Sequence, residues 1–196
     1  PMAVAIASGD ADYAVTAISG GLISLAEKGA AKVIGGALSE EKGIDWQKIL
    51  ASNAAYDAGL TSPAALGGRS YAVTQPGSSF HYMGAKISAA EGATVSFKPL
   101  QKVGAIIGAL KSGQVDAWSI VPHIAKALAG GGAVKIIGDV ADYLPGYQVT
   151  TVFTSANNAA KERAQTEAFL RAFSRGADDF NAALVDKTAG GDAGED

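Results

Sequence analysis

Residues 69–92 read RSYAVTQPGSSFHYMGAKISAAEG, and this stretch predicts a strand, a tight loop and a helix in succession. Residues 70–74 contain β-branched and aromatic side chains, and the Pro-Gly pair at 76–77 ends the strand. Ser78 or Ser79 can then cap the helix. One face of this helix is expected to be buried and carries apolar side chains at Phe80, Met83, Ile87 and Ala90.

A loop of this kind is a candidate binding site for a small anion. It leaves unpaired backbone N–H groups and the positive end of the helix dipole at the carboxyl edge of a sheet. Most strand-loop-helix turns in α/β proteins bind no ligand, so a purely structural turn is the alternative.

The composition predicts a globular protein. The chain has 196 residues, 48% of them hydrophobic and 18% charged, which suits one ordinary domain or two small lobes with a sizeable core. Its 16 Lys and Arg against 19 Asp and Glu give a formal charge of −3, so nothing indicates nucleic acid or an acidic membrane as a partner. The longest apolar runs, such as residues 103–110, fall short of the roughly 18 residues that a membrane span needs.

The sequence lacks the motifs that would indicate catalysis. It contains no Gly-x-Ser-x-Gly, no phosphate loop ending in Gly-Lys-Ser or Gly-Lys-Thr, and no His-Glu-x-x-His. The absence of Cys excludes disulfides, thiolate metal sites and cysteine nucleophiles, and only two His residues could serve a metal. We therefore expect no enzyme activity, no cofactor and no metal site.

A short repeat predicts two lobes of similar design. Ser-Gly-x-x-Asp occurs at residues 8–12 and again at 112–116, and each copy precedes an expected strand, a polar turn, a helix rich in Ala and Leu, and another strand. We expect residues 8–34 and 112–137 to adopt the order helix, strand, helix and strand in separate lobes. Two α/β lobes imply a cleft between them.

The spacing of apolar residues predicts the remaining elements. A docked helix is expected around Trp46, Ile49 and Leu50. Residues 188–196 are expected to be frayed. A closing helical segment at 160–184 should pack one face on a lobe through Leu170, Phe173, Ala177, Phe180 and Leu184. Further helices are expected at 3–8, at 103–110 and before Gly29, the last with Leu22, Leu25 and Ala26 facing inward. Strands are expected at 12–17, 32–34, 93–97 and within 143–154.

Three segments carry a resemblance to a known family. They are SGDADYAV from Ser8, TSPAALGGR at 61–69 leading to Gly-Ser-Ser at 77–79, and ALKSGQVDA at 109–117. In this order and spacing, nearly the whole chain resembles the substrate-binding proteins of ABC importers, in the subgroup for sulfonates, nitrate, taurine and thiamine-precursor-like compounds. The resemblance implies an α/β fold, the two-lobed type II periplasmic binding fold, which closes on its ligand and delivers it to a permease in the inner membrane.

The resemblance also implies lobe boundaries and a compartment. Residues 1–68 would belong to lobe I, residues 69–147 to lobe II, and residues 148–196 to a return crossing with C-terminal helices that pack on lobe I. Family members usually begin with a strand and helix of lobe I that precede the start of this chain, so the N-terminal part of that lobe is expected to be missing. We expect a periplasmic monomer, exported by a signal peptide that is not in this chain.

The loops that follow the strands would face the ligand. Family members often have an acidic residue before the proline of the second lobe's ligand turn, whereas Val121 precedes Pro122 here, which argues against a cationic or amine-bearing ligand. We expect a small organic or inorganic anion of the sulfonate, nitrate, taurine or carboxylate type. The expected ligand-binding residues are Thr16, Ala17, Ile18, Ser19, Gln75, Gly77, Ser78, Ser79, Trp118, Ser119 and His123.

Several candidate residues have a structural alternative. Trp118 can equally be a core aromatic residue, and His123 can be a surface residue at a helix start. His81 is expected to lie on the central helix without any chemical role. Asp12 and Asp116 could form a carboxylate pair, but their equivalent places in the repeat favour a role in capping or bracing a turn.

A second function stays open beside solute binding. The effector-sensing domain of a LysR-type transcription regulator is also two-lobed, but it accompanies a helix-turn-helix that this sequence lacks. Thiamine-precursor synthases that share the fold depend on a cysteine-rich segment, which a Cys-free chain cannot contain.

Overall fold

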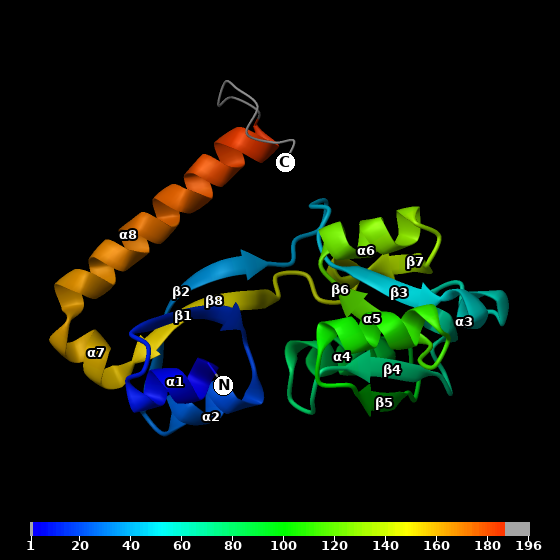
Figure 1. Ribbon diagram of the computed structural model, residues 1–196, viewed down its shortest axis with the longest axis horizontal. Coiled ribbons are helices and arrows are strands. Elements are labelled where there is room, and N and C mark those ends of the chain that lie inside the picture. The colour runs from blue at the N-terminus through cyan, green and yellow to red at the C-terminus, as the bar shows by residue number, and fades with distance from the viewer. Residues whose placement is uncertain (1, 187–196) are drawn as a thin grey trace. The chain divides into compact units, whose positions relative to one another are not determined.

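The computed structural model describes residues 2–186, apart from the side chains of residues 184 and 185. It is a mixed α/β structure (Figure 1). No helix in this part of the chain is long and apolar enough to cross a membrane. The elements are, in order, α1 (Met2–Ser8), β1 (Tyr13–Ala17), α2 (Gly20–Glu27), β2 (Ala31–Ser39), β3 (Lys48–Ser52), α3 (Asn53–Asp57), η1 (Pro63–Ala65), β4 (Ser70–Val73), α4 (Ser79–Ala90), β5 (Ser96–Pro99), α5 (Val103–Lys111), β6 (Ala117–Ile120), α6 (Pro122–Gly130), β7 (Val134–Asp139), η2 (Val140–Asp142), β8 (Gln148–Ser155), α7 (Ala156–Lys161), α8 (Arg163–Phe180) and the π-helical turn η3 (Asn181–Val185).

The chain divides into two compact units. Of the described residues, the first unit contains 2–14, 25–35 and 153–186, and the second contains Val15–Ser24 and Gly36–Val152. These units do not coincide with the lobes expected from the sequence, 1–68, 69–147 and 148–196. The difference arises because β3, which was expected in lobe I, pairs with β6 and β7 of the second unit.

A five-stranded sheet forms the framework of the second unit, in the order β5-β4-β6-β3-β7. Strand β4 runs parallel to β5 and β6, whereas β3 runs antiparallel to both of its neighbours. All five residues of β3 are buried. The docked helix expected around Ile49 and Leu50 is therefore wrong, because a short apolar run that is buried on both faces has no periodicity to distinguish strand from helix.

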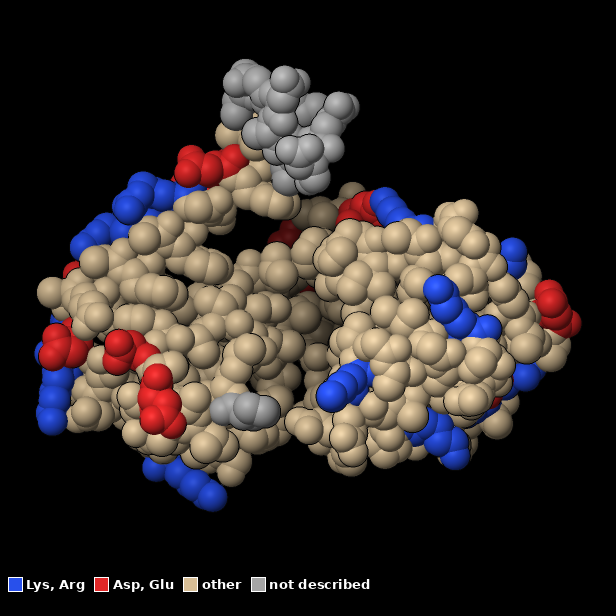
Figure 2. Space-filling view, in the orientation of Figure 1, with Lys and Arg blue, Asp and Glu red and all other residues tan. Residues whose placement is uncertain are grey.

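Two hydrophobic clusters cover the two faces of this sheet. Ile49 belongs to a cluster that contains Met83 and Ile87 of α4, and Leu50 belongs to a cluster that contains Ile106 of α5 and Ala125 of α6. Successive side chains of a strand point to opposite faces, so β3 contributes to both clusters. On the side of the molecule seen in Figure 2, uncharged residues cover most of this unit, with Lys and Arg side chains scattered among them. Lys48 and Lys126 both form ion pairs with Asp45.

The expected strand-loop-helix unit is confirmed at 70–90. Strand β4 and helix α4 form as predicted, and Met83 and Ile87 are fully buried. Phe80 is half-buried, whereas Ala90 is exposed. The buried face of α4 therefore ends one turn earlier than the sequence suggested.

The repeat is confirmed in the order of its elements, but the expectation of separate lobes is wrong for residues 15–24 of the first copy, which belong to the same unit as the second copy. The first copy forms α1, β1, α2 and β2, and the second forms α5, β6, α6 and β7. The strands of the two copies belong to different sheets, since β1 and β2 lie in a three-stranded sheet of order β1-β8-β2. In each sheet a strand from elsewhere in the chain lies between the two strands of the repeat, β8 in one sheet and β3 in the other.

The two aspartates of the repeat differ in their roles. Asp116 Oδ2 accepts hydrogen bonds from the backbone N–H and the hydroxyl of Ser70, both at 2.7 Å. Its role is structural, as expected, but it links the start of β4 to the residue before β6 and does not brace a turn. Asp12 contributes its backbone carbonyl instead, which accepts a hydrogen bond from Thr154 Oγ1 at 2.6 Å, while its side chain is exposed.

The closing helix packs over less of its length than expected. Phe169 stacks on Tyr13 with ring centroids 4.4 Å apart, and Leu170 and Phe173 are half-buried. Ala177 and Phe180 are exposed, so the expected packing face is wrong in the C-terminal part of the helix. The spacing of apolar residues shows which face of a helix is apolar, but it does not show how far along the helix another element packs on that face. The expectations for the Leu184 side chain and for residues 188–196 lie outside the described residues.

A buried carboxyl group lies in the segment that leads from β2 to β3. Glu40 is fully buried, and its Oε1 accepts a hydrogen bond of 2.7 Å from Gln47 Nε2, whereas its Oε2 has no partner among the described residues. Its backbone is bound on both sides, since the Glu40 N–H donates to Tyr147 O at 2.8 Å and the Gly146 N–H donates to Glu40 O at 2.7 Å. Burial raises the pKa of the Glu40 carboxyl, against the opposing effect of the Gln47 hydrogen bond.

Replacement of Gly84 by Ala should destabilise the protein. A Cβ atom at this buried position of α4 would lie 2.7 Å from Tyr71 Cε1 and 2.8 Å from Phe97 Cε1, and Tyr71 is fully buried and cannot move aside. We expect a loss of about 1–3 kcal/mol in the free energy of unfolding, measured by urea denaturation. Gly108→Ala in α5 is the matched control, because nothing lies within 4 Å of its added Cβ, and it should gain about 0.4–1 kcal/mol. A neutral or stabilising Gly84→Ala would contradict the packing of α4 on β4 and β5.

Replacement of Glu40 by Gln should remove a pH-dependent loss of stability. With a raised native pKa, the folded chain keeps this proton above pH 4.5, the ordinary pKa of a Glu carboxyl, where the unfolded chain releases it. The free energy of unfolding therefore falls as pH rises from 4.5 through the raised pKa, and it stays lowered above that pKa. The expected gain in Glu40→Gln at higher pH is about 1.4 kcal/mol per pKa unit of difference between the two states.

Urea denaturation of Glu40→Gln and the parent from about pH 4 to pH 8 measures this effect. Glu41→Gln is the matched control, since Glu41 is the exposed neighbour in the same segment. Parallel stability curves for the parent and Glu40→Gln over the whole range would show that the Glu40 carboxyl is not held protonated by burial.

Candidate ligand-binding pocket

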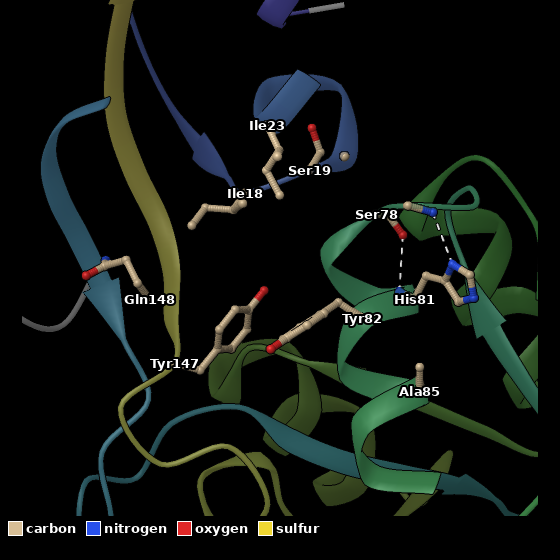
Figure 3. A pocket seen from close by; sticks show the side chains of 11 residues that line it. Ile18, Ser19, Ile23, Ser78, His81, Tyr82, Ala85, Tyr147 and Gln148 are labelled. Atoms are coloured by element: carbon tan, nitrogen blue, oxygen red, sulfur yellow. Dashed lines mark hydrogen bonds between the residues drawn. The ribbon is translucent and has the colours of Figure 1, made fainter. Parts of the chain in front are cut away.

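The second unit contains a pocket of about 580 Å³. Its walls come from the start of α2, from one side of α4 and from the chain that enters β8 (Figure 3). The lining residues are Ile18, Ser19, Gly20, Ile23, Gly77, Ser78, His81, Tyr82, Ala85, Tyr147 and Gln148.

The loop before α4 is shaped by its turn residues. Gly77 has φ of 77°, a left-handed conformation that glycine adopts without strain. Ser78 is extended and caps the helix, because its Oγ accepts a hydrogen bond of 3.3 Å from the His81 N–H. The cap expected at Ser78 or Ser79 is therefore Ser78.

Only some N–H groups of this loop are free for a ligand. The Gly77 N–H donates to His81 Nδ1 at 3.0 Å, and the Ser78 N–H donates to Gln75 O at 3.2 Å. The N–H groups of Ser79 and Phe80 donate no hydrogen bond within the described part of the chain. Together with the Ser78 hydroxyl proton, these two N–H groups are the donors that the start of α4 can offer.

The wall from α2 is held by the same loop. The Gly20 N–H donates to Gly77 O at 3.0 Å, and Ser19 caps α2 by accepting a hydrogen bond of 3.3 Å from the Leu22 N–H. Ile18 and Ile23 present apolar side chains to the pocket, and Ile23 is 49% exposed. This wall therefore combines one hydroxyl with aliphatic surface.

An aromatic pair forms the third wall. The rings of Tyr82 and Tyr147 lie with centroids 5.1 Å apart and planes tilted by 38°, and both rings reach into the pocket in Figure 3. Burial raises the pKa of Tyr147 to about 12, with smaller contributions from Tyr82 and the Glu40 charge, so its hydroxyl is neutral near pH 7 and can donate a hydrogen bond. The Lys86 ammonium lies 5.7 Å from the Tyr82 ring centroid.

Gln148 is fixed at the entrance to β8. Its Nε2 donates to Leu38 O at 2.8 Å and to Thr150 O at 2.7 Å. Gly36 leaves room for this amide, since a Cβ atom there would lie 2.8 Å from Gln148 Oε1. The Gln148 amide nitrogen is thus used within the protein.

The pocket can accept a neutral or anionic group but offers nothing for a metal. None of its lining residues is Asp, Glu, Lys or Arg, so an anion entering it meets no carboxylate. Within residues 2–186, no group of three or more His, Asp or Glu side chains comes together in a way that could hold a metal ion.

The structure brings some of the expected ligand-binding residues together. Ile18, Ser19, Gly77 and Ser78 line the pocket. The other expected residues near these loops do not line it: Thr16 and Ala17 are half-buried in β1, Gln75 is exposed, and Ser79 is buried at the start of α4.

The residues expected from the strand β6 lie elsewhere. Trp118 is fully buried and packs against Phe80 with ring centroids 5.5 Å apart, so the structure favours its alternative as a core aromatic residue. Ser119 is also fully buried and forms a hydrogen bond with the Tyr71 hydroxyl. His123 is exposed in the first turn of α6. None of the three lines the pocket.

Sequence reasoning missed more than half of the pocket. His81, Tyr82 and Ala85 follow Ser78 at intervals of three, four and seven, so they share a face of α4 that spacing could have identified. Gly20 and Ile23 follow Ser19 in the same helix start. Tyr147 and Gln148 come from a distant segment, and no local pattern in the sequence places them here.

Solved structures show the same fold. The periplasmic aliphatic sulphonate binding protein SsuA from Escherichia coli matches with a TM-score of 0.74 and 22% identity, over 95% of this chain and 61% of that one. The alkanesulfonate-binding protein SsuA from Xanthomonas axonopodis pv. citri, bound to MOPS, matches with a TM-score of 0.75 and 20% identity over the same shares. The CA3427 gene product of Candida albicans, described as having the generic periplasmic binding protein fold, matches with a TM-score of 0.74 and 14% identity, over 93% of this chain and 59% of that one.

These similarities confirm the type II periplasmic binding fold expected from the sequence. The chain spans about 60% of the length of these structures, 61% for each sulfonate-binding protein. No curated protein matches the sequence. The family model described as NMT1/THI5 like matches residues 2–183, and the chain therefore belongs to the NMT1/THI5-like family.

Proposed function

We propose that this chain is the solute-binding part of an ABC importer and that it binds an organic anion in the pocket of the second unit. The observation that carries the proposal is the start of α4. Its two free N–H groups, at Ser79 and Phe80, lie beside the Ser78 hydroxyl, next to a pocket without a charged lining residue.

The start of α4 supplies the anion-binding end. The helix dipole contributes roughly 0.3–1 kcal/mol to an anion near the first turn, and each net hydrogen bond contributes about 0.5–1.5 kcal/mol. These contributions can hold a carboxylate or sulfonate without a cationic side chain. Ser19, on the facing wall, can add a further hydroxyl donor.

The size and lining of the pocket favour an anion with an apolar part. Pockets of about 300–1,000 Å³ hold organic ligands of drug size, so a volume of about 580 Å³ far exceeds a nitrate ion or taurine. Ile18, Ile23, Tyr82 and Tyr147 would contact the apolar part, with about 25 cal/mol gained for each Å² of apolar surface removed from water. Of the anions expected from the sequence, a sulfonate or carboxylate with a bulky tail fits best.

The remaining parts of the proposal rest on the family. We infer that the protein acts in the periplasm as a monomer, releases its ligand unchanged to a permease in the inner membrane, and captures it by closure of two lobes. Two of the proteins that share this fold are sulfonate-binding proteins, which supports a transport role over catalysis.

A charge at position 78 tests whether the ligand is an anion. Ser78→Asp keeps an oxygen that can cap α4, but it places a carboxylate at the proposed anion site. Two like charges about 4 Å apart repel by about 4 kcal/mol at an effective dielectric constant of about 20, so the affinity for a sulfonate should fall by roughly a hundredfold or more. Isothermal titration calorimetry with a panel of sulfonates, in Tris rather than a sulfonate buffer, measures this loss.

Ser78→Asn is the matched control, because it also caps the helix and carries no charge. Its affinity should stay within about fivefold of the parent, the value of one net hydrogen bond. Equal losses in both variants would mean that position 78 acts only as a helix cap. A ligand that binds Ser78→Asp more tightly than the parent would be a cation and would refute the proposal.

Removal of an aromatic ring tests the apolar end. Tyr82 is 45% exposed, so Tyr82→Ala should leave the fold intact. The affinity of the parent should rise from methanesulfonate through taurine to MOPS or benzenesulfonate, and Tyr82→Ala should weaken the bulky sulfonates by about tenfold while it leaves the small ones unchanged. Calorimetry over this series measures the dependence on tail size.

Tyr147→Phe provides the control for the aromatic wall, since it keeps the ring and removes only the hydroxyl. We expect it to retain the preference for bulky tails. A parent protein that binds taurine as tightly as benzenesulfonate would show that Tyr82 and Tyr147 do not contact the ligand.

A further inference from the structure

We propose that His81 is the positioning residue of this pocket, and that it acts through Gly77 on both the α4 wall and the α2 wall. The sequence suggested no chemical role for His81. The part of the inference that concerns ligand affinity rests on the proposed function, whereas the part that concerns the protein alone does not.

The imidazole of His81 is held in one tautomer by a backbone donor. Its Nδ1 accepts a hydrogen bond of 3.0 Å from the Gly77 N–H, so the proton of the neutral ring is on Nε2. The ring also packs edge-on against Phe97, with centroids 4.4 Å apart and planes at 73°. In Figure 3 a dashed line marks the hydrogen bond to Nδ1, and the His81 ring points away from Tyr82 and Tyr147. The part of His81 that matters for the pocket is therefore Nδ1.

Gly77 connects the His81 ring to the α2 wall of the pocket through two hydrogen bonds. Glycine can adopt many backbone conformations, and Gly77 is in the left-handed region at φ 77°. Its N–H is fixed by His81, and its carbonyl accepts the Gly20 N–H at 3.0 Å. Gly20 begins α2 and directly follows Ile18 and Ser19, which line the pocket. A continuous path of two hydrogen bonds thus runs from the His81 ring to the α2 wall.

The hydrogen bond from the Gly77 N–H to His81 also limits the N–H donors that are free to bind a ligand. Because His81 takes up the Gly77 N–H, the ligand is left with the N–H groups of Ser79 and Phe80. Loss of the Nδ1 acceptor would free the peptide between Pro76 and Gly77 to rotate. A resulting change in φ or ψ of Gly77 would then shift the next peptide, whose carbonyl holds Gly20. His81 would then affect affinity through the backbone, in addition to any contact that it makes as a lining residue.

Two substitutions separate the two nitrogen atoms of the ring. Asn places its side-chain oxygen near the position of Nδ1, so His81→Asn keeps an acceptor for the Gly77 N–H. Gln places its amide near the position of Nε2, so His81→Gln loses that acceptor and keeps the outer donor. His123→Gln is the control, because the second His of the chain is exposed and does not line the pocket.

Measurements on the ligand-free protein test the path directly. Nitrogen-15 NMR of the parent should show an unprotonated Nδ1 and a protonated Nε2 in His81. Amide hydrogen exchange at Gly20 and Gly77 should be about three- to tenfold faster in His81→Gln than in the parent, the effect of one net hydrogen bond, and unchanged in His81→Asn and His123→Gln. Equal exchange at Gly20 in the parent and His81→Gln would overturn the proposal.

Calorimetry with MOPS as the probe tests the effect on binding. His81→Gln should bind about three- to tenfold more weakly than the parent, and His81→Asn should stay within about twofold of the parent. An equal loss in both variants would assign the role to Nε2 or to the whole ring and would overturn the proposal. A parent protein that binds no sulfonate would contradict the proposed function, and the exchange at Gly20 would still decide the role of His81.

Discussion

The second unit depends on the burial of one antiparallel strand. All five residues of β3 are buried, and a buried backbone must find hydrogen-bond partners for nearly all of its N–H and C=O groups. β3 satisfies this requirement with β6 on one side and β7 on the other. Its alternating side chains then anchor two clusters, Ile49 toward α4 and Leu50 toward α5 and α6. The position of α4, and with it the pocket, follows from this central strand.

The sequence predicts correctly those elements whose structure depends on residues close to one another in the chain. The strand-loop-helix unit at 69–92, the cap at Ser78 and the order of elements in the repeat all depend on neighbouring residues. β3 was assigned to a helix because its burial depends on partners about 70 and 90 residues further along the chain. Tyr147 was missed for the same reason, since its place opposite Tyr82 results from long-range pairing. Trp118 was ambiguous because a strand aromatic can face a core or a ligand, and only packing against Phe80 decides between them.

The chain segment that contains Tyr147 is hydrogen-bonded to Glu40, whose buried carboxyl group lowers the stability of the protein. Glu40 holds this segment through two backbone hydrogen bonds, yet its own carboxyl is buried, and one of its oxygens has no partner among residues 2–186. An unpaired buried carboxyl is unfavourable, and such features tend to persist where the structure around them serves a function. Here the carboxyl lies in the pair of chain segments that positions the aromatic wall. The stability of this region and the shape of the pocket therefore depend on the same few residues.

Acceptors within the protein set the number of hydrogen-bond donors that remain free at the start of α4, the anion site that we propose. The first N–H groups of a helix have no partner within the helix, and here the protein supplies acceptors to some of them and to the preceding loop. Gln75 O takes the Ser78 N–H, His81 Nδ1 takes the Gly77 N–H, and the Ser78 hydroxyl oxygen takes the His81 N–H. Two adjacent donors remain, at Ser79 and Phe80, with the Ser78 hydroxyl proton beside them. Two or three neighbouring donors suit a group that presents several oxygens from one atom, as a sulfonate or carboxylate does, and they offer nothing to a cation. The preference for an anion that we propose would thus come from which internal acceptors are present, and each of those acceptors lies within four residues of the donor that it binds.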